Sequence, residues 1–208
     1  MPTTLSVSDC ISFGWKTFKS RPWFFVGTIV IYAIVQTVLS GIQDALDLAG
    51  ILISAIAGML FYMGFLTLYL KAHDNAAAAK FSDFWNPAPF WNYLGVSILL
   101  FLIVFVGLIL LVVPGIIFAL MFSFAGFLVV EKGMNPIKAL KESARLTKGN
   151  RWKLFLLGLA LLGLTIIGMI PLFLGLLVVG PIAMFASIHA YRVLSGTQEM
   201  PAVSPTQS

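Results

Sequence analysis

The sequence predicts an all-α fold, a polytopic membrane helical bundle of six transmembrane helices with additional interfacial amphipathic helices. Of its 208 residues, 60% are hydrophobic and only 10% are charged, and the mean hydropathy is +1.00. Soluble domains carry about 25% charged residues, so this chain has too few charges to cover a water-facing surface. Two further observations support a membrane fold: uncharged apolar runs of spanning length, and basic residues confined to certain connections between them.

The apolar runs define six expected spans within a single integral membrane domain, residues 1–200. About 20 apolar residues cross a hydrocarbon core of about 30 Å. The last run, residues 154–190, would be about 55 Å long as one helix, so we expect it to fold back. The spans are expected at residues 23–41, 48–70, 93–113, 115–130, 154–170 and 172–190, and residues 201–208 are expected to form a short disordered tail.

Helix breaks are expected where proline and glycine interrupt the apolar runs. Proline lacks a backbone donor, and glycine admits unusual backbone angles. Pro114 and Gly115 are expected to form a tight turn between the third and fourth spans. Pro171 is expected at the turn between the fifth and sixth spans, and Pro181 is expected to kink the sixth.

The placement of charge predicts the topology. All 13 Lys and Arg residues fall on one side of the six-span arrangement, and the three opposite connections contain only Asp44 and Asp47 as charged residues. Basic residues are retained in cytoplasmic loops, so both termini are expected to be cytoplasmic. An odd number of spans would spoil this partition.

The connection after the fourth span is predicted to contain a short helix. Asn135 can cap it, Pro136 suits its first position, and Gly149 suits the residue beyond its end, so the helix is expected from Pro136 to Thr147 or Lys148. On a helical wheel one arc is basic, and the opposite side is formed by Ile137, Leu140, Ala144 and Thr147. The basic residues here are Lys138, Lys141, Arg145 and Lys148, followed by Arg151.

A basic amphipathic helix can lie in the headgroup layer of a membrane, where each Lys or Arg contributes about 1 kcal/mol near an anionic surface. We therefore expect these five basic residues to contact anionic lipid headgroups. The plainer alternative is topological anchoring by positive charge, without specific recognition.

Two other segments are expected to lie at the interface. In the N-terminal segment, Val7, Ile11, Gly14, Trp15 and Phe18 share one face at helical spacing. The shorter second segment contains the aromatic residues Phe81, Phe84 and Trp85. Any of these interfacial segments could instead pack on a cytoplasmic partner.

The sequence contains little that predicts catalysis. The six predicted spans contain no charged residue, although such residues at membrane depth are functional candidates by default. The single Cys10 and the lack of Cys/His clusters predict no metal site and no cofactor. His73 and His189 are expected to lie at the interface, without the nucleophile and acid of a triad. Gly158 and Gly163 are expected to permit close helix packing.

The region from Val112 to Phe155 resembles the YciC-like bacterial inner-membrane proteins. The residues that carry the resemblance are Val112-Val113-Pro114-Gly115-Ile116-Ile117, an apolar run to Glu131, and the segment from Ala139 to Thr147. Related patterns occur in the membrane domain attached to some glycerophosphoryl diester phosphodiesterases. The resemblance implies a multi-pass protein of the bacterial cytoplasmic membrane and supplies no catalytic residue. The enzyme domain of the phosphodiesterases has no counterpart here, so their activity is not carried over.

The leading functional hypothesis is a non-enzymatic inner-membrane protein that organises or senses the membrane, or scaffolds partners. The expected partners are lipids with anionic headgroups and either another protein or a second copy of the chain, but no nucleic acid. The alternative is a carrier or channel-like protein for an apolar or lipid-like molecule, with Pro114 and Pro181 as hinges.

Overall fold

The computed structural model describes residues 5–77, 79–85, 87, 89–169 and 175–196. Within these residues the chain forms helices and no strand. The predicted turn residue Pro171 and the predicted tail at 201–208 lie outside the described residues. The elements are α1 (Val7–Ser20), α2 (Pro22–Asp74), the short 3-10 helix η1 (Phe81–Phe84), α3 (Phe90–Leu110), α4 (Val112–Met121), α5 (Ala125–Lys132), α6 (Pro136–Thr147), α7 (Arg151–Met169) and α8 (Leu176–Ser195).

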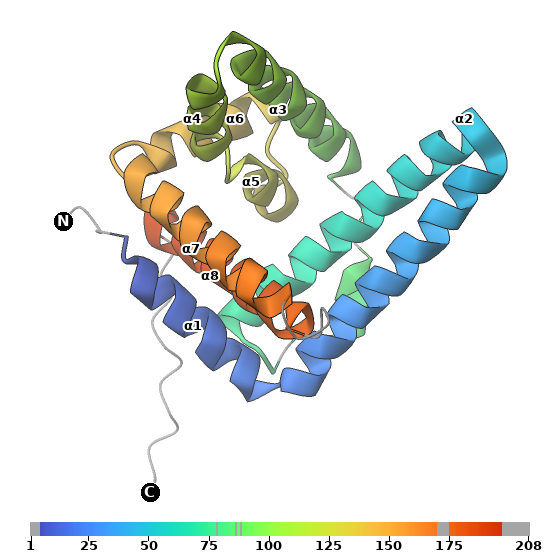
Figure 1. Ribbon diagram of the computed structural model, residues 1–208, viewed down its shortest axis with the longest axis horizontal. Helices are drawn as coiled ribbons and strands as arrows, with labels where there is room; N and C mark the ends of the chain where they lie inside the picture. The colour runs from blue at the N-terminus through green and yellow to red at the C-terminus, as the bar shows by residue number, and fades with distance from the viewer. Residues whose placement is uncertain (1–4, 78, 86, 88, 170–174, 197–208) are drawn as a thin grey trace, which may run out of the picture.

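Helix α2 turns back on itself to form a hairpin that projects from the rest of the molecule (Figure 1). The reversal occurs at Leu46 and Asp47, where the backbone leaves the helical region and Asp47 has a φ of 47°. Close to this turn the arms meet at Gly50, where a Cβ would lie 3.0 Å from Gln43 Cα. The two arms of α2 contain the first and second predicted spans.

Five helices of the described residues are long and apolar enough to cross a membrane. They are Pro22–Asp74, Phe90–Leu110, Val112–Lys132, Arg151–Met169 and Leu176–Ser195. The first of these has 53 residues and contains the reversal of α2. The apolar helices suggest a membrane protein, and the count of six spans remains a prediction.

The turn between α3 and α4 lies at Leu111, which is extended, and not at Pro114 and Gly115 as predicted. Pro114 instead occupies the first turn of α4, where a missing backbone donor removes no intrahelical hydrogen bond. Gly115 is buried at the point where the two helices touch, and a Cβ at Gly107 would lie 3.0 Å from Gly115 Cα. The Pro-Gly pair therefore starts a helix and allows close packing.

The core of the protein lies where the α2 hairpin meets α8. The Phe185 ring lies 4.9 Å, centroid to centroid, from both Phe25 and Tyr69. Thr28 Oγ1 and the Tyr69 hydroxyl form a buried hydrogen bond of 2.8 Å between the two arms of α2. Pro181 is buried within α8, which continues through it to Ser195. The kink expected at Pro181 remains a prediction.

Helix α1 lies along α8 (Figure 1). Its buried residues are Cys10, Gly14 and Phe18, and a Cβ at Gly14 would lie 2.6 Å from the Ile182 carbonyl oxygen. Gly14 and Phe18 belong to the apolar face predicted for this helix, but Trp15 is exposed. This face therefore packs in part on α8, and the interfacial position of α1 remains a prediction.

The thiol of Cys10 is expected to resist alkylation while α1 remains on α8. Burial raises the pKa of Cys10 from its ordinary value of 9.0 to about 11, which lowers the thiolate fraction about a hundredfold at neutral pH. Maleimide labelling at pH 7.5 should be negligible in mild detergent and complete in denaturant. Rapid labelling of the folded protein would show that α1 leaves α8.

The segment after α2 folds back over the base of the α2 hairpin. The Arg21 guanidinium donates hydrogen bonds to the carbonyls of Ala76 and Ala79, at 2.8 and 3.2 Å. In η1, the Phe84 ring stacks on Phe61 with centroids 5.1 Å apart. The Phe81 ring lies 4.8 Å, centroid to centroid, from Phe24. Two residues of the predicted aromatic interfacial stretch thus pack on α2, while Phe81 and Trp85 keep exposed surface.

Acid is expected to loosen this segment. The Lys71 ammonium donates to Asp83 Oδ1 at 2.6 Å, and the Lys80 backbone amide donates to Oδ2 at 3.0 Å. The Lys71 hydrogen bond holds the pKa of Asp83 below its ordinary value of 3.8. A lowered carboxyl pKa gives stability that is complete above the ordinary value and is lost as the pH falls through the lowered one.

Because Lys71 is 55% exposed, the contribution of this pair is at most about 1 kcal/mol. Hydrogen exchange of residues 80–85 should accelerate below pH 3.8 in the wild type. In the Asp83→Asn variant, exchange of these residues should be fast at every pH and should show no acceleration below pH 3.8. A titration midpoint above 3.8 for Asp83 would contradict the assignment.

Candidate functional site

Helix α6 is held by hydroxyl groups against a break between α4 and α5. The Phe124 backbone amide donates to Ser143 Oγ at 3.1 Å, and Ser143 Oγ donates to the Met121 carbonyl at 3.0 Å. Thr147 Oγ1 donates to the same carbonyl at 3.1 Å. The predicted bounds and cap of α6 are confirmed: the helix spans Pro136–Thr147, and the Asn135 side chain accepts a hydrogen bond from Ile137.

Ser143→Ala is expected to destabilise this junction by about 1–3 kcal/mol, because it leaves the buried Phe124 amide without an acceptor. Chemical denaturation in detergent micelles would measure the loss. Ser123→Ala is the matched control, since the Ser123 hydroxyl only donates to the Leu120 carbonyl within its own turn. Equal stability of the two variants would show that Ser143 does not hold α6.

The four basic residues predicted on one arc of α6 are all exposed, namely Lys138, Lys141, Arg145 and Lys148. Arg145 forms a bidentate pair with Glu142, with Nη2–Oε1 at 2.6 Å and Nε–Oε2 at 2.8 Å, and this contact lowers the pKa of Glu142. No ion pair is found for the three lysines within the described part of the chain. Lysine charge thus dominates this surface.

The opposite side of α6 is only partly as predicted. Leu140 and Thr147 are buried, but Ile137 is 59% exposed. The remaining buried residues are Ala139, Ser143 and Leu146. Because α6 contacts α3, α4 and α5, its apolar side packs on protein (Figure 1). The buried residues of α6 therefore face protein, while Ile137 keeps an exposed apolar surface.

Arg151, the fifth predicted basic residue, begins α7 and lies beside an apolar groove between α4 and α7. Its Nε is buried and has no hydrogen-bond acceptor among the described residues. The groove encloses ≈ 340 Å³, and its other lining residues are all apolar or aromatic. Arg151 thus belongs to α7, whereas the other four basic residues lie on α6 or at its C-terminal cap.

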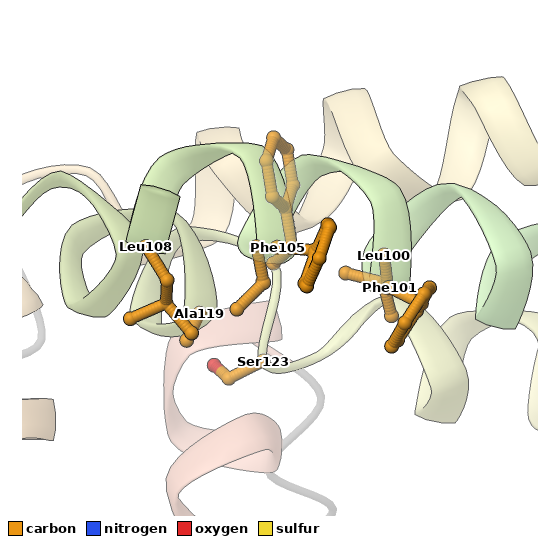
Figure 2. Close-up of a pocket in the computed structure, with 8 residues that line it drawn as sticks. Leu100, Phe101, Phe105, Leu108, Ala119 and Ser123 are labelled. Carbon is orange, nitrogen blue, oxygen red and sulfur yellow. The ribbon is translucent and has the colours of Figure 1, made fainter. Parts of the chain in front are cut away.

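A second hollow, of ≈ 410 Å³, lies between α3 and α4 at the break before α5. Figure 2 shows Phe101, Phe105 and Leu108 of α3 together with Ala119 of α4, and the Ser123 hydroxyl lies near the break. The rings of Phe101 and Phe105 are stacked with centroids 5.5 Å apart. This site is suited to an apolar group.

The structure also brings together charged residues that the sequence analysis did not connect. Arg192, only 5% exposed, donates to Asp74 Oδ2 at 2.6 Å and also to Glu131 Oε1. The Tyr191 hydroxyl donates to Glu131 Oε2 at 2.5 Å. We call these four residues the ionic cluster, and it joins the ends of α2, α5 and α8.

His73 and His189, predicted to be interfacial residues, lie beside the ionic cluster. His73 Nε2 and His189 Nδ1 are 3.2 Å apart, and both rings pack on Phe13. The one available sequence signal was that Asp74, Glu131 and Arg192 each lie at the end of an apolar run. Among the described residues, no group of three or more His, Cys, Asp or Glu side chains is placed to hold a metal ion.

The family described as protein of unknown function, DUF975, matches residues 5–198. This chain belongs to the DUF975 family. Its relatives include uncharacterised proteins from two strains of Mycobacterium tuberculosis and from Mycobacterium bovis, each 26% identical over 233 residues, which cover 96% of this chain and 72% of the relative.

No solved structure matches this DUF975 protein. The relatives, like the family, are uncharacterised, so they transfer no activity. The resemblances to the YciC-like proteins and to the membrane domain of glycerophosphoryl diester phosphodiesterases remain predictions.

Proposed function

We propose that this DUF975 protein is a non-enzymatic, multi-pass protein of the bacterial inner membrane, with both termini cytoplasmic, that organises or senses the membrane or scaffolds partners. In this proposal the basic surface of α6 contacts anionic lipid headgroups. The observation that carries the proposal is that α6 exposes Lys138, Lys141 and Lys148 while Ser143 and Thr147 fix its other side to the break between α4 and α5.

A fixed array of cations suits a charged membrane surface. The array is positioned by the fold, so little conformational freedom is lost when headgroups bind. Each lysine contributes about 1 kcal/mol near an anionic leaflet, so three together would give about a hundredfold preference for anionic lipid. Arg145 is expected to contribute less, because Glu142 already neutralises it. The same basic residues favour a cytoplasmic location for this connection.

The absence of enzymatic activity is part of the proposal. It is supported by the state of the ionic cluster, in which Arg192 pairs with both Asp74 and Glu131. These three charged side chains form ion pairs with one another, and the pairs link α8 to α2 and α5. The proposed partners are anionic lipids and either another protein or a second copy of the chain, with no role for nucleic acid.

The test is native mass spectrometry of the protein released from membrane nanodiscs that contain phosphatidylcholine and phosphatidylglycerol. A variant with Lys138, Lys141, Arg145 and Lys148 all changed to Gln should lose most of the retained anionic lipid. The matched control exchanges Lys for Arg and Arg for Lys at the same positions, preserves charge, and should retain the lipid. Equal retention by the Gln variant, with its thermal unfolding unchanged, would count against the proposal.

The alternative is a carrier or channel-like protein for an apolar or lipid-like molecule, and the hollow between α3 and α4 favours it (Figure 2). Its test is the movement of a fluorescent phospholipid across proteoliposomes. Movement that survives the α6 Gln variant but fails in Pro181→Ala would support this alternative. No movement with the folded wild type would count against it.

A further inference from the structure

The groove between α4 and α7 has the composition of an amphiphile site. Its α4 wall includes Ile116, Ile117 and Leu120, and its α7 wall includes Phe155. Its volume of ≈ 340 Å³ falls within the range of small-molecule pockets, about 300–1,000 Å³. These walls supply no polar partner, so they suit a hydrocarbon chain.

The polar component of this groove is Arg151. A buried guanidinium N–H without an acceptor is costly and is usually satisfied by a ligand or water. The other three arginines of the chain have acceptors: Arg21 has backbone carbonyls, Arg145 has Glu142, and Arg192 has two carboxylates. Arg192 also has an unpaired Nε, but both of its Nη groups are paired.

The surroundings of Arg151 favour an anion. Among the described residues, no Asp or Glu lines the groove. Lys148 and Lys153 flank Arg151 in the chain, so the local charge is positive. Trp152, the neighbouring residue, is 70% exposed and also lines the groove, and Trp is typical of the headgroup level of a membrane.

We propose that this groove binds one phospholipid with an anionic headgroup, with an acyl chain against Ile117 and Phe155 and the phosphate paired with Arg151. An arginine can bind phosphate through two parallel hydrogen bonds, which gives selectivity that lysine does not. The inference rests on the proposed membrane function, but it assigns one retained lipid to Arg151 and the groove, separate from the exposed lysines of α6.

The experiment counts phosphatidylglycerol molecules retained per chain in native mass spectra, after release from mixed phosphatidylcholine and phosphatidylglycerol nanodiscs. Arg151→Gln is expected to lower the occupancy of this one groove lipid about tenfold, the effect of losing one charge-assisted contact. Lys153→Gln is the matched control, because it makes the same charge change two residues away, outside the groove lining, and it should retain the lipid. Arg151→Lys should give an intermediate result.

A second variant tests the groove without changing charge. Ile117→Trp fills the space against Phe155 and should also release the lipid, and its thermal unfolding in detergent shows whether it folds. If it does not fold, Ile116→Phe is the milder substitute with the same expected effect. The α6 Gln variant should keep this one lipid, so failure of the α6 proposal and failure of the groove proposal give different results.

Three results would overturn the groove proposal. Undiminished retention by folded Arg151→Gln would show that Arg151 does not bind the headgroup. Equal loss in Lys153→Gln would show that retention reflects only diffuse positive charge. Binding of soluble glycerol 3-phosphate as tightly as phosphatidylglycerol would show a phosphate site without a role for the acyl chain.

Discussion

Replacing Arg192 by methionine is expected to destabilise the folded protein by about 3 kcal/mol, one of the two largest effects among single substitutions proposed for this chain. Removing one partner from a buried ion pair costs about 3–5 kcal/mol, because the remaining charge stays desolvated and unpaired. The lower end of this range of cost applies here, because the side chains of Asp74 and Glu131 are 44% and 22% exposed and remain partly hydrated. The measurement is urea or thermal unfolding in detergent micelles.

Arg145→Gln is the control for Arg192→Met, because it also breaks an arginine–carboxylate pair. That pair lies on the surface, with the Arg145 side chain 70% exposed, so its loss should cost less than about 1 kcal/mol. A second comparison adds Glu131→Gln and Asp74→Asn to Arg192→Met. Removing all three charges should recover much of the stability, whereas equal unfolding of Arg192→Met and Arg145→Gln would show that the ionic cluster does not hold α2, α5 and α8 together.

The ionic cluster also shows what the sequence could not predict. Asp74, Glu131 and Arg192 are separated by 57 and 61 positions, and each lies at the end of an apolar run, where a charge is ordinary. Only the packing of α2, α5 and α8 brings them within hydrogen-bond distance. Apolar periodicity predicts that a segment is helical, but it does not predict which helices pack against one another.

Sequence signals that act between neighbouring residues, such as helix caps, predicted the structure better than signals that depend on contacts between distant helices. The cap and first-turn proline of α6 predicted its bounds, because capping is a contact between neighbours in the chain. The helix-breaking interpretation of Pro114 was wrong by three residues, since a proline is as compatible with the start of a helix as with its end. The apolar side of α6 was recognised only in part, because the position of α5 decides what is buried.

The same limit applies to glycines at helix contacts. Gly158 and Gly163 were predicted to allow close packing, yet a Cβ at either would have no neighbour within 4 Å. The close contacts involve other glycines, among them Gly14, Gly64 and Gly115. A glycine in an apolar helix therefore indicates a contact only once the neighbouring backbone has been located.

Gly64→Ala is expected to have an effect comparable to that of Arg192→Met. Gly64 is buried on the second arm of α2, and a Cβ there would overlap the backbone carbonyl of Phe84 and lie 2.8 Å from Phe84 Cα. Backbone atoms cannot rotate away as a flexible side chain can, so η1 must move. Overpacking of this kind costs about 1–3 kcal/mol, and here it would also strain the Lys71–Asp83 ion pair.

Gly58→Ala is the matched control, six residues earlier on the same arm of α2. Its nearest neighbours would be Leu39 Cδ1 at 3.6 Å and Gln36 Oε1 at 3.8 Å, which are ordinary contacts. Alanine also favours helix over glycine by up to about 1 kcal/mol, so Gly58→Ala should be neutral or stabilising. Hydrogen exchange should show faster exchange at residues 80–85 in Gly64→Ala alone. If both variants leave that segment protected, then η1 does not rest on α2 at Gly64, and the loop after α2 is held by Arg21 and Asp83 instead.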